Sequence, residues 1–308
     1  MSDFVLTTPV VLTIFNRAHL AKRVFEEIRR AKPTKLYVIA DGPRPNHPYD
    51  KERCLAARAV VEAVDWDCQV FKNYSDDNLG CGRRTASGLD WVFSMEEQAI
   101  IFDDDCLPHQ TLFRFYQEML DRYRGDDRIV SISGNNYRFS GQRLHYSYHF
   151  SRFPHLWGWA TWRDVWQRYY DFKINLWPEI RDNNWLTDIF GLVQAEAGPS
   201  SEVFKTICRD EDIRYWSRKF NIIHKEMWNT WDYQFFFMCF LQNGLAVLPN
   251  VNLVSNIGFG DEATHTCSVT ELANVPTEPM TFPVLHPPFM IADAFADAYM
   301  QLIFNRSC

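Results

Sequence analysis

The chain has 308 residues, of which 46% are hydrophobic and 23% charged, a composition typical of a globular protein and not of a disordered one. The formal net charge of −7 gives no electrostatic reason to expect nucleic-acid binding. No signal peptide is recognisable, and the longest apolar run, FFFMCFL over residues 235–241, is much shorter than the roughly 20 residues that span a bilayer.

Cysteine usage indicates the redox compartment. The eight cysteines, at positions 54, 68, 81, 106, 208, 239, 267 and 308, include no CxxC pair. We interpret them as reduced thiols and expect a cytoplasmic protein.

The first third of the chain alternates strand patterns with helical ones. Buried strands are predicted over 9–15, 35–40, 68–74 and 98–102, and helices over 20–28, 50–64 and 85–93. This alternation is typical of right-handed βαβ units and a mainly parallel sheet. Neither GxGxxG nor GxxxxGK[ST] is present, so we expect no dinucleotide fingerprint and no P-loop.

Polar residues collect where these strands end, which is where open α/β sheets bind ligands. The most informative stretch is AIIFDDDCL, residues 99–107, in which Asp103, Asp104 and Asp105 follow a buried strand. Adjacent carboxylates repel one another, so a cation is expected among them, and oxygen ligands suit Mg²⁺ or Mn²⁺. The alternative is a solvated acidic turn that caps a helix beginning near Pro108.

The second half is richer in aromatic residues and in helical patterns. Helices are predicted over 108–124, within 174–228, from Asp232 to about 242, and in the tail along the stripe of Ile291, Phe295, Tyr299 and Phe304; strands are predicted over 128–134 and 245–259. We expect the tail helix to pack on the protein and not to lie on a membrane, because acidic residues interrupt its apolar stripe.

Two features of this half have alternative interpretations. In HLWGWATW, residues 155–162, Gly158 either lets a backbone approach a ligand or packs among core rings. Asp232, in NTWD, either caps a helix or takes part in chemistry.

Six segments, taken in order along the chain, resemble glycosyltransferases of the GT-A type, in the nucleotide-diphospho-sugar transferase superfamily. They are TIFNR, NLGC, DDDC with a following Pro, HLWGWATW, TWDYQ and PNVNLVSNIGFG…THT. The resemblance covers nearly the whole chain and extends distantly to the inverting N-acetylglucosaminyltransferase I family. It implies an α/β fold of the GT-A (Rossmann-like) kind: a mainly parallel sheet flanked by helices, with an elaborated helical acceptor-side second half. We predict a single domain over 1–308, with residues 1–135 binding the nucleotide-sugar and 136–308, including the C-terminal helix, binding the acceptor.

The same resemblance implies an activity: metal-dependent, inverting transfer of a sugar from a UDP-sugar donor to a hydroxyl of a glycan, a lipid-linked or a small-molecule acceptor. Asp105 and His265 would bind Mn²⁺ or Mg²⁺, and Asp232 would be the general base. Donor contacts would come from Phe15, Asn16, Arg17, Asp41, Arg83 or Arg84, Asp103 and Asp104. The motif departs from the usual Glu-Asp-Asp in its first acid, which is shorter here.

Two other function classes stay open. A nucleotidyltransferase on a related fold would attack the α-phosphate, but it would want a Gly-rich, Lys-bearing first strand, which TIFNRAHL lacks. A non-catalytic carbohydrate-binding or partner-binding protein would ignore UDP. If Asp232 is only a cap, Asp261 and Glu262 are the next candidates for the base. The donor sugar, the acceptor and homodimer formation through the tail helix are left open.

Overall fold

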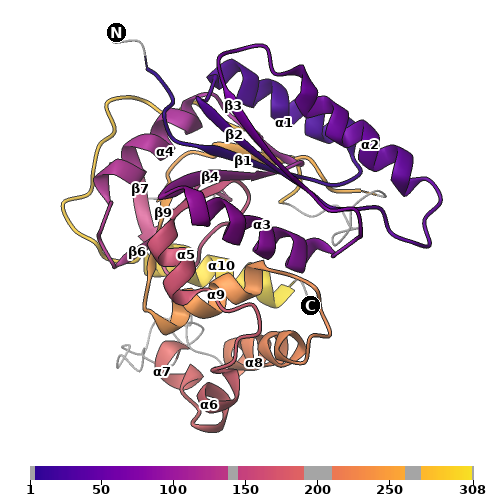
Figure 1. Ribbon diagram of the computed structural model, residues 1–308. Helices are drawn as coiled ribbons and strands as arrows, with labels where there is room; N and C mark the ends of the chain where they lie inside the picture. The colour runs from indigo at the N-terminus through magenta and orange to yellow at the C-terminus, as the bar shows by residue number, and fades with distance from the viewer. Residues whose placement is uncertain (1–3, 138–144, 191–209, 261–271, 307–308) are drawn as a thin grey trace.

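The computed structural model describes residues 4–137, 145–190, 210–260 and 272–306. In these residues one eight-stranded mixed sheet forms the centre of the fold, with helices on both faces (Figure 1). Its strands are β1 (Val10–Ile14), β2 (Lys35–Ala40), β3 (Gln69–Tyr74), β4 (Gln98–Asp103), β6 (Ile129–Ser133), β7 (Tyr148–Ser151), β8 (Trp159–Trp162) and β9 (Leu245–Pro249), in the spatial order β3-β2-β1-β4-β8-β6-β9-β7.

The first four strands are parallel neighbours, as the sequence predicts. Val10 of β1 lies opposite Leu36 of β2 on one side and opposite Ile100 of β4 on the other. Because parallel strands end at one edge of a sheet, Asn16, Asp41 and Asp105, which follow β1, β2 and β4, all lie at the same edge. The predicted α/β class and the predicted grouping of these strand ends are therefore confirmed.

β8 is a strand that the sequence reading missed, and it runs antiparallel to both of its neighbours. Trp159 pairs with Ile101 of β4 and with Ser133 of β6, and all four residues of the strand are buried. HLWGWATW therefore contributes a central strand. Six strands of the sheet run in one direction, and only β7 and β8 oppose them, so the sheet is mixed but mostly parallel.

Helices cover both faces of the sheet. Figure 1 shows α1 (Ala18–Ala31), α2 (Asp50–Val60) and α4 (Thr111–Arg122) on one face, and α3 (Cys81–Met95), α5 (Arg163–Tyr169) and α9 (Asp232–Leu241) on the other. A short 3₁₀ turn, η1 (Val61–Ala63), extends α2. The predicted inward positions of α1, Leu20, Val24 and Ile28, are all buried, which confirms the 3.6-residue apolar period there.

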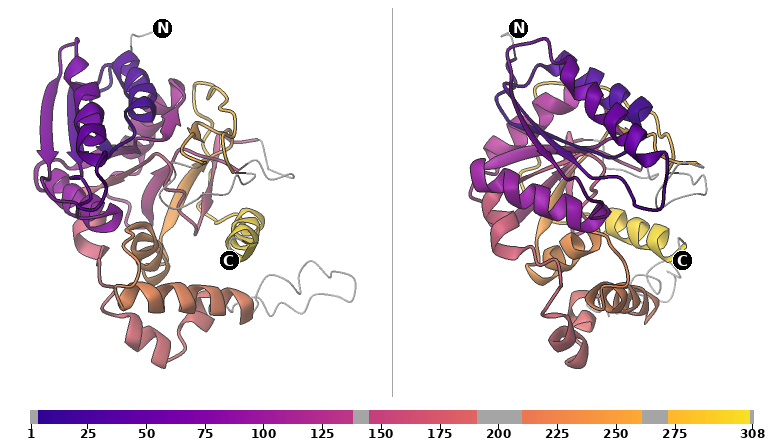
Figure 2. Two further views of the ribbon diagram at one scale, coloured as in Figure 1. Left: turned by 90° about the vertical axis from the view of Figure 1, so that its right-hand side faces the viewer. Right: turned by 45° about the vertical axis from the view of Figure 1, so that its right-hand side comes forward.

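The second half adds a helical lobe below the sheet, built from α6 (Trp177–Asp182), α7 (Leu186–Phe190) and α8 (Asp210–His224) (Figures 1 and 2). Trp216 of α8 is fully buried, and its ring contacts Phe220 and Phe240. The aromatic richness of this half is therefore largely a packed core. The predicted loop over 197–201 lies outside the described residues, and no helix within the described ranges is long and apolar enough to cross a bilayer.

Three predicted elements differ in the structure. The strand predicted over 245–259 is broken after Pro249. There the Asn252 side chain accepts a hydrogen bond from the backbone N–H of Asn136 (2.9 Å) and donates to two carbonyls. The chain then forms β10 (Val254–Asn256), which pairs with β5 (Cys106–Pro108) in a separate two-stranded sheet. Because β5 occupies these residues, α4 begins at Thr111, and the acidic motif does not cap it.

The tail helix α10 (Ala294–Arg306) forms, and its predicted stripe is packed only in part. Phe304 contacts the Trp216 ring (centroids 5.3 Å apart), whereas Ile291 and Phe295 are exposed; the buried positions include Ala296, Asp297 and Met300. Asp297 is accommodated because it accepts hydrogen bonds from the Ser151 hydroxyl (2.6 Å) and from Arg152 (3.0 Å).

Candidate active site

The acidic motif lies at the carboxyl edge of the sheet, and its nearest cation belongs to the chain itself. Arg17, just after β1, forms ion pairs with Asp104 and with Asp105 (2.8 Å to Oδ2). Asp104 is buried and also accepts a long bond from the backbone N–H of Phe15 (3.5 Å). Asp104 therefore joins the end of β1 to the end of β4, and Arg17 partly balances the motif.

Asp103 has no ion pair of this kind: within the described ranges its carboxylate makes no hydrogen bond or ion pair. Burial by surrounding protein raises the pKa of Asp103 well above its usual range, and the negative charges of Asp105, Asp104 and Asp232 add to that effect, whereas the positive charge of Arg17 opposes it only in part. A carboxylate with this environment favours binding of a further cation.

Cys81, the first residue of α3, connects the acidic motif to Asp232. Its thiol is exposed, yet surrounding protein raises its pKa, and the carboxylates of Asp103 and Asp232 raise that pKa further. The Asp232 carboxylate therefore lies within electrostatic range of Cys81 and of the motif, although it is far from both in the sequence.

Asp232 occupies the first position of α9 and divides its two carboxylate oxygens between two environments. One oxygen, Oδ1, accepts from the Thr230 hydroxyl and from the backbone N–H of Tyr233 (2.9 Å). The other, Oδ2, has no hydrogen-bond partner within the described part of the chain. The N-cap residue of α9 is Trp231, which makes no side-chain cap bond. Asp232 thus satisfies one first-turn N–H, as a cap would, and keeps one oxygen available.

Trp231 fixes this helix start against the core. Its ring stacks on Trp159 of β8 (centroids 5.4 Å apart), and its carbonyl accepts from the Tyr170 hydroxyl (3.2 Å). The neighbouring Asn229 binds the first turn of α3, where Gly82 donates to its carbonyl (3.3 Å). The sequence analysis did not select four residues of this region: Asn229, Thr230, Trp231 and Cys81. The one sequence signal for the first three was that they directly precede Asp232.

Asp41, which was expected to contact the donor base, binds the loop before α3. Its Oδ1 accepts from the N–H groups of Gly42 and Leu79, and its Oδ2 accepts from Gly80 and from the Asn78 amide, all within 3.0 Å. Four donors satisfy both oxygens. A contact between this carboxylate and a nucleotide stays a prediction, and it would require one of these bonds to be replaced.

The two arginines of α3 do not lie together. Arg84 is buried and donates to the carbonyls of Ala40 (3.2 Å) and Asn73 (2.5 Å), at the ends of β2 and β3. Arg83 is exposed and pairs with Glu226 (2.6 Å). Arg84 therefore joins the ends of β2 and β3, Arg83 joins α3 to the segment before α9, and their contacts with a donor stay predictions.

Phe15 and Asn16 belong to a second polar group, at the ends of β1 and β2. Asn16 donates to Asp50 (3.0 Å), and Arg44 binds Asp50 through two nitrogens (2.6 and 3.0 Å) while its guanidinium lies 5.5 Å from the centre of the Phe15 ring. Hydrogen bonding by Arg44 lowers the pKa of Asp50 to about 2, so this carboxylate stays charged. Sequence reading missed Arg44 and Asp50, which lie within and just after the loop that follows β2.

The residues present suit a divalent ion that is shared with donor phosphates. Asp105 has Arg17 on one oxygen, and its other oxygen meets only the Cys106 thiol at 3.6 Å. No three His, Cys, Asp or Glu side chains in the described ranges are grouped closely enough to hold a metal by themselves. Mg²⁺-type sites at phosphates usually take only one or two carboxylates, which Asp105 and Asp103 supply. His265 lies outside the described residues.

The chain just before His265 is nevertheless anchored at the motif. The N–H of Ile257 donates to the carbonyl of Asp105 (2.9 Å). A Cβ on Gly258 would lie 2.1 Å from Asp105 Oδ2, so only glycine allows the backbone to pass there. Gly158 has a related role inside the protein: its added Cβ would lie 2.9 Å from Val254 and 3.1 Å from Phe102, so its close approach is to the core and not to a ligand.

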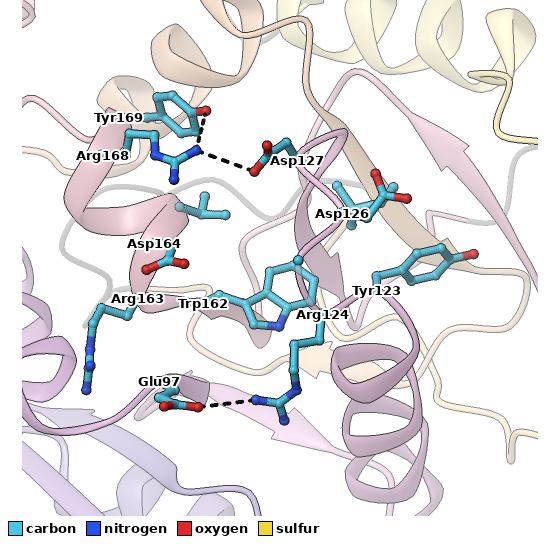
Figure 3. A pocket seen from close by; sticks show the side chains of 13 residues that line it. Glu97, Tyr123, Arg124, Asp126, Asp127, Trp162, Arg163, Asp164, Arg168 and Tyr169 are labelled. Carbon is cyan, nitrogen blue, oxygen red and sulfur yellow. Dashed lines mark hydrogen bonds and ion pairs between the residues drawn. The ribbon is translucent and has the colours of Figure 1, made fainter.

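A separate cavity of about 270 Å³ lies at the opposite edge of the sheet, near the start of β4 and β6 (Figure 3). It contains none of the predicted site residues. It holds two ion pairs, Arg124 with Glu97 (3.3 Å) and Arg168 with Asp127 (3.4 Å). We place the candidate site at the acidic edge, where the predicted site residues lie and where Arg17 pairs with Asp104 and Asp105.

Comparison with solved structures finds distant similarity. The chain matches a mannosyltransferase, PcManGT from Pyrobaculum calidifontis in complex with GDP-Man and Mn²⁺ (TM-score 0.39, 16% identity, 55% of this chain and 48% of that one). It also matches S. aureus TarS 1–349 (0.36, 10%, 58% and 49%) and a UDP-glucose pyrophosphorylase complexed with UDP-glucose (0.33, 10%, 52% and 78%). The alignment thus spans about half the length of the first two proteins. These scores are too low to assign a family or to transfer an activity.

No protein-family model and no curated protein matches the sequence.

Proposed function

We propose that this chain is a metal-dependent glycosyltransferase that moves a sugar, with inversion, from a UDP-sugar to an acceptor hydroxyl. One observation carries the proposal: three consecutive carboxylates lie at the carboxyl edge of a mostly parallel sheet, Arg17 pairs with two of them, and Asp232, whose Oδ2 has no partner in the described residues, lies within electrostatic range of them. This arrangement matches the needs of the reaction, which are a site for a metal–diphosphate complex and a nearby base. The sequence resemblance to GT-A enzymes points the same way.

The residues divide the reaction between them. Oδ2 of Asp232 takes the proton of the acceptor hydroxyl while the hydroxyl oxygen forms its bond to the anomeric carbon. The bond between that carbon and the diphosphate breaks, and its electron pair leaves on UDP. A divalent ion bound at Asp105, with Asp103 nearby, would neutralise charge on the leaving diphosphate. Arg17 holds Asp104 and Asp105 in place, and Phe15 with Arg44 offers an aromatic and cationic surface for the nucleoside.

A cytoplasmic setting fits this proposal. The five cysteines that the structure describes are all free thiols, and three of them are buried.

The first test is a screen of UDP-sugars for slow Mn²⁺-dependent hydrolysis, which needs no acceptor. Asp105→Ala should abolish Mn²⁺-dependent UDP binding in titration calorimetry, with an unchanged melting temperature. His265→Ala should weaken metal binding less, because one of several ligands is lost. Asp67→Ala, an exposed acid elsewhere, is the matched control.

Unchanged Mn²⁺-dependent affinity in Asp105→Ala would remove that residue from the site. A wild-type chain that neither binds UDP nor hydrolyses any UDP-sugar would contradict the proposed function. Transfer of a nucleotidyl group, detected as pyrophosphate release from a nucleoside triphosphate, would favour the nucleotidyltransferase alternative.

A further inference from the structure

Three half-buried aromatic rings from separate segments meet beside the acidic motif. Tyr137 follows β6, Trp157 precedes β8, and Phe259 follows β10. The ring centres are 5.5 Å apart for Tyr137 and Trp157, and 5.6 Å for Trp157 and Phe259, with near-perpendicular planes of 89° and 80°. We call these three residues the aromatic row. Their partial exposure distinguishes them from the fully buried rings of the core.

The aromatic row is attached directly to the acidic motif. Phe259 follows Gly258, whose backbone passes against Asp105. Trp157 precedes Gly158, which packs over Phe102 of β4. Both connections hold the rings at the edge of the sheet where β4 ends.

Strand order separates the aromatic row from the Phe15 and Arg44 group. β1 and β2 lie on one side of β4, whereas β8 and β6 lie on the other. A donor with its nucleoside near β1 and its diphosphate at Asp105 would therefore direct its sugar towards the aromatic row. The occupant of the row is then the molecule that receives the sugar.

Two buried polar side chains adjoin the aromatic row at Tyr137. His155 and Asn135 are almost completely buried, and the Tyr137 ring lies 4.6 Å from the His155 ring. Asn135 Oδ1 and His155 Nε2 have no hydrogen-bond partner within the described ranges. Buried polar atoms without partners are costly, so this neighbourhood is not a finished apolar core. Aromatic rings next to unsatisfied hydrogen-bonding groups suit a ligand that has both an apolar face and many hydroxyl groups.

We propose that the aromatic row is the acceptor subsite and that the acceptor is a saccharide whose pyranose ring packs on Trp157. This inference rests on the proposed function and adds to it the chemical class of the acceptor. A purely lipid acceptor would not need the unsatisfied polar groups that adjoin Tyr137.

The test is binding of the labelled full-length chain to an array of immobilised glycans, in the presence of UDP and Mn²⁺. We expect the wild type to bind a set of pyranose glycans and Trp157→Ala to lose about tenfold or more in affinity. Trp157→Phe should retain part of the binding. Trp185→Ala, which removes an exposed tryptophan of the helical lobe, should bind as the wild type does. If Trp157→Ala does not fold, Phe259→Ala takes its place.

The outcomes separate this inference from the proposed function. An empty array from a wild-type chain that hydrolyses UDP-sugars overturns the saccharide acceptor alone. Equal glycan binding by the wild type and a folded Trp157→Ala also overturns it. Glycan binding that needs Trp157, in a chain with no affinity for UDP, retains the subsite but overturns the glycosyltransferase.

Discussion

The side chain of Asn229 lies across the N-terminus of α3, where its Oδ1 accepts a hydrogen bond from the backbone N–H of Arg83 at 3.0 Å. Its Nδ2 donates to the carbonyl of Leu79 (2.9 Å). Asn229 therefore caps a helix of the first half of the chain from a segment of the second half. Because Asp232 follows three residues later, this contact sets the distance between the proposed base and the acidic motif.

Asn229→Ala should reduce both stability and turnover. Loss of the cap should lower the free energy of unfolding by about 1 kcal/mol, and the released segment should move Asp232 and lower kcat. Asn229→Asp keeps the accepting oxygen and should restore most of the stability. Urea denaturation and turnover measure the two effects. Lost stability with unchanged turnover would mean that the position of Asp232 does not depend on this contact.

Asp232→Asn separates the base from the helix-start role. Asn can still accept from Thr230 and Tyr233, so the melting temperature should change little. Asn cannot take a proton, so kcat should fall by about 10²-fold or more while UDP-sugar affinity persists. Asp188→Asn, an exposed acid in the first turn of α7, is the control. Near-normal turnover of Asp232→Asn would leave it a structural residue and direct attention to Asp261 and Glu262.

Asp103→Asn should stabilise the protein at neutral pH. The pKa of Asp103 is higher in the folded chain than in the unfolded one, so the folded state binds the proton more tightly. The contribution of Asp103 to stability is therefore fully present below its pKa in the unfolded chain, about 4. It is lost as the pH rises through its pKa in the folded chain. Removing the charge should raise the melting temperature at neutral pH, with the advantage shrinking towards about pH 4.

The difference between Asp103→Asn and wild type isolates this group from other titrating residues such as His155, whose pKa burial lowers to about 3. Mn²⁺ should raise the melting temperature of the wild type more than that of the variant. A constant difference across pH would contradict the assignment of an uncompensated charge to Asp103.

Gly258→Ala should disturb Asp105 specifically. The new Cβ would lie 2.1 Å from Asp105 Oδ2, so the carboxylate or the chain must move, and Mn²⁺-dependent UDP affinity should fall. Gly125→Ala is the matched control: Gly125 has φ +75° and no atom within 4 Å of an added Cβ, so alanine there should cost stability without affecting UDP binding. Equal UDP affinity in both variants would contradict the importance of the close approach.

The fold of the first third could be predicted because its signals are local. Apolar runs identify β1, β2 and β4, and the helical period identifies the buried face of α1. Parallel strands end at one edge, so the grouping of Asn16, Asp41 and Asp105 followed from the predicted parallel pairing. These predictions required no knowledge of side-chain partners.

The partners themselves could not be predicted, because they come from distant segments. Asp41 and Arg84 follow the expected pattern of polar residues near strand ends, yet Asp41 binds backbone N–H groups of the loop before α3, and Arg84 binds carbonyls of β2 and β3. Likewise, a four-residue strand made of Trp, Ala, Thr and Trp has no alternation that separates it from a buried loop. Its place between β4 and β6 is a tertiary property.

That placement has a consequence for how the protein is made. As the chain leaves the ribosome, β4 can pair with β1 at once, but its other edge must wait until Trp162 has emerged. During that interval an apolar strand carrying the acidic motif presents unpaired N–H and C=O groups, which invite pairing with another chain. Synthesis that stalls between β4 and β8 should therefore yield aggregates, and a gene fragment ending at residue 135 should be a client of chaperones.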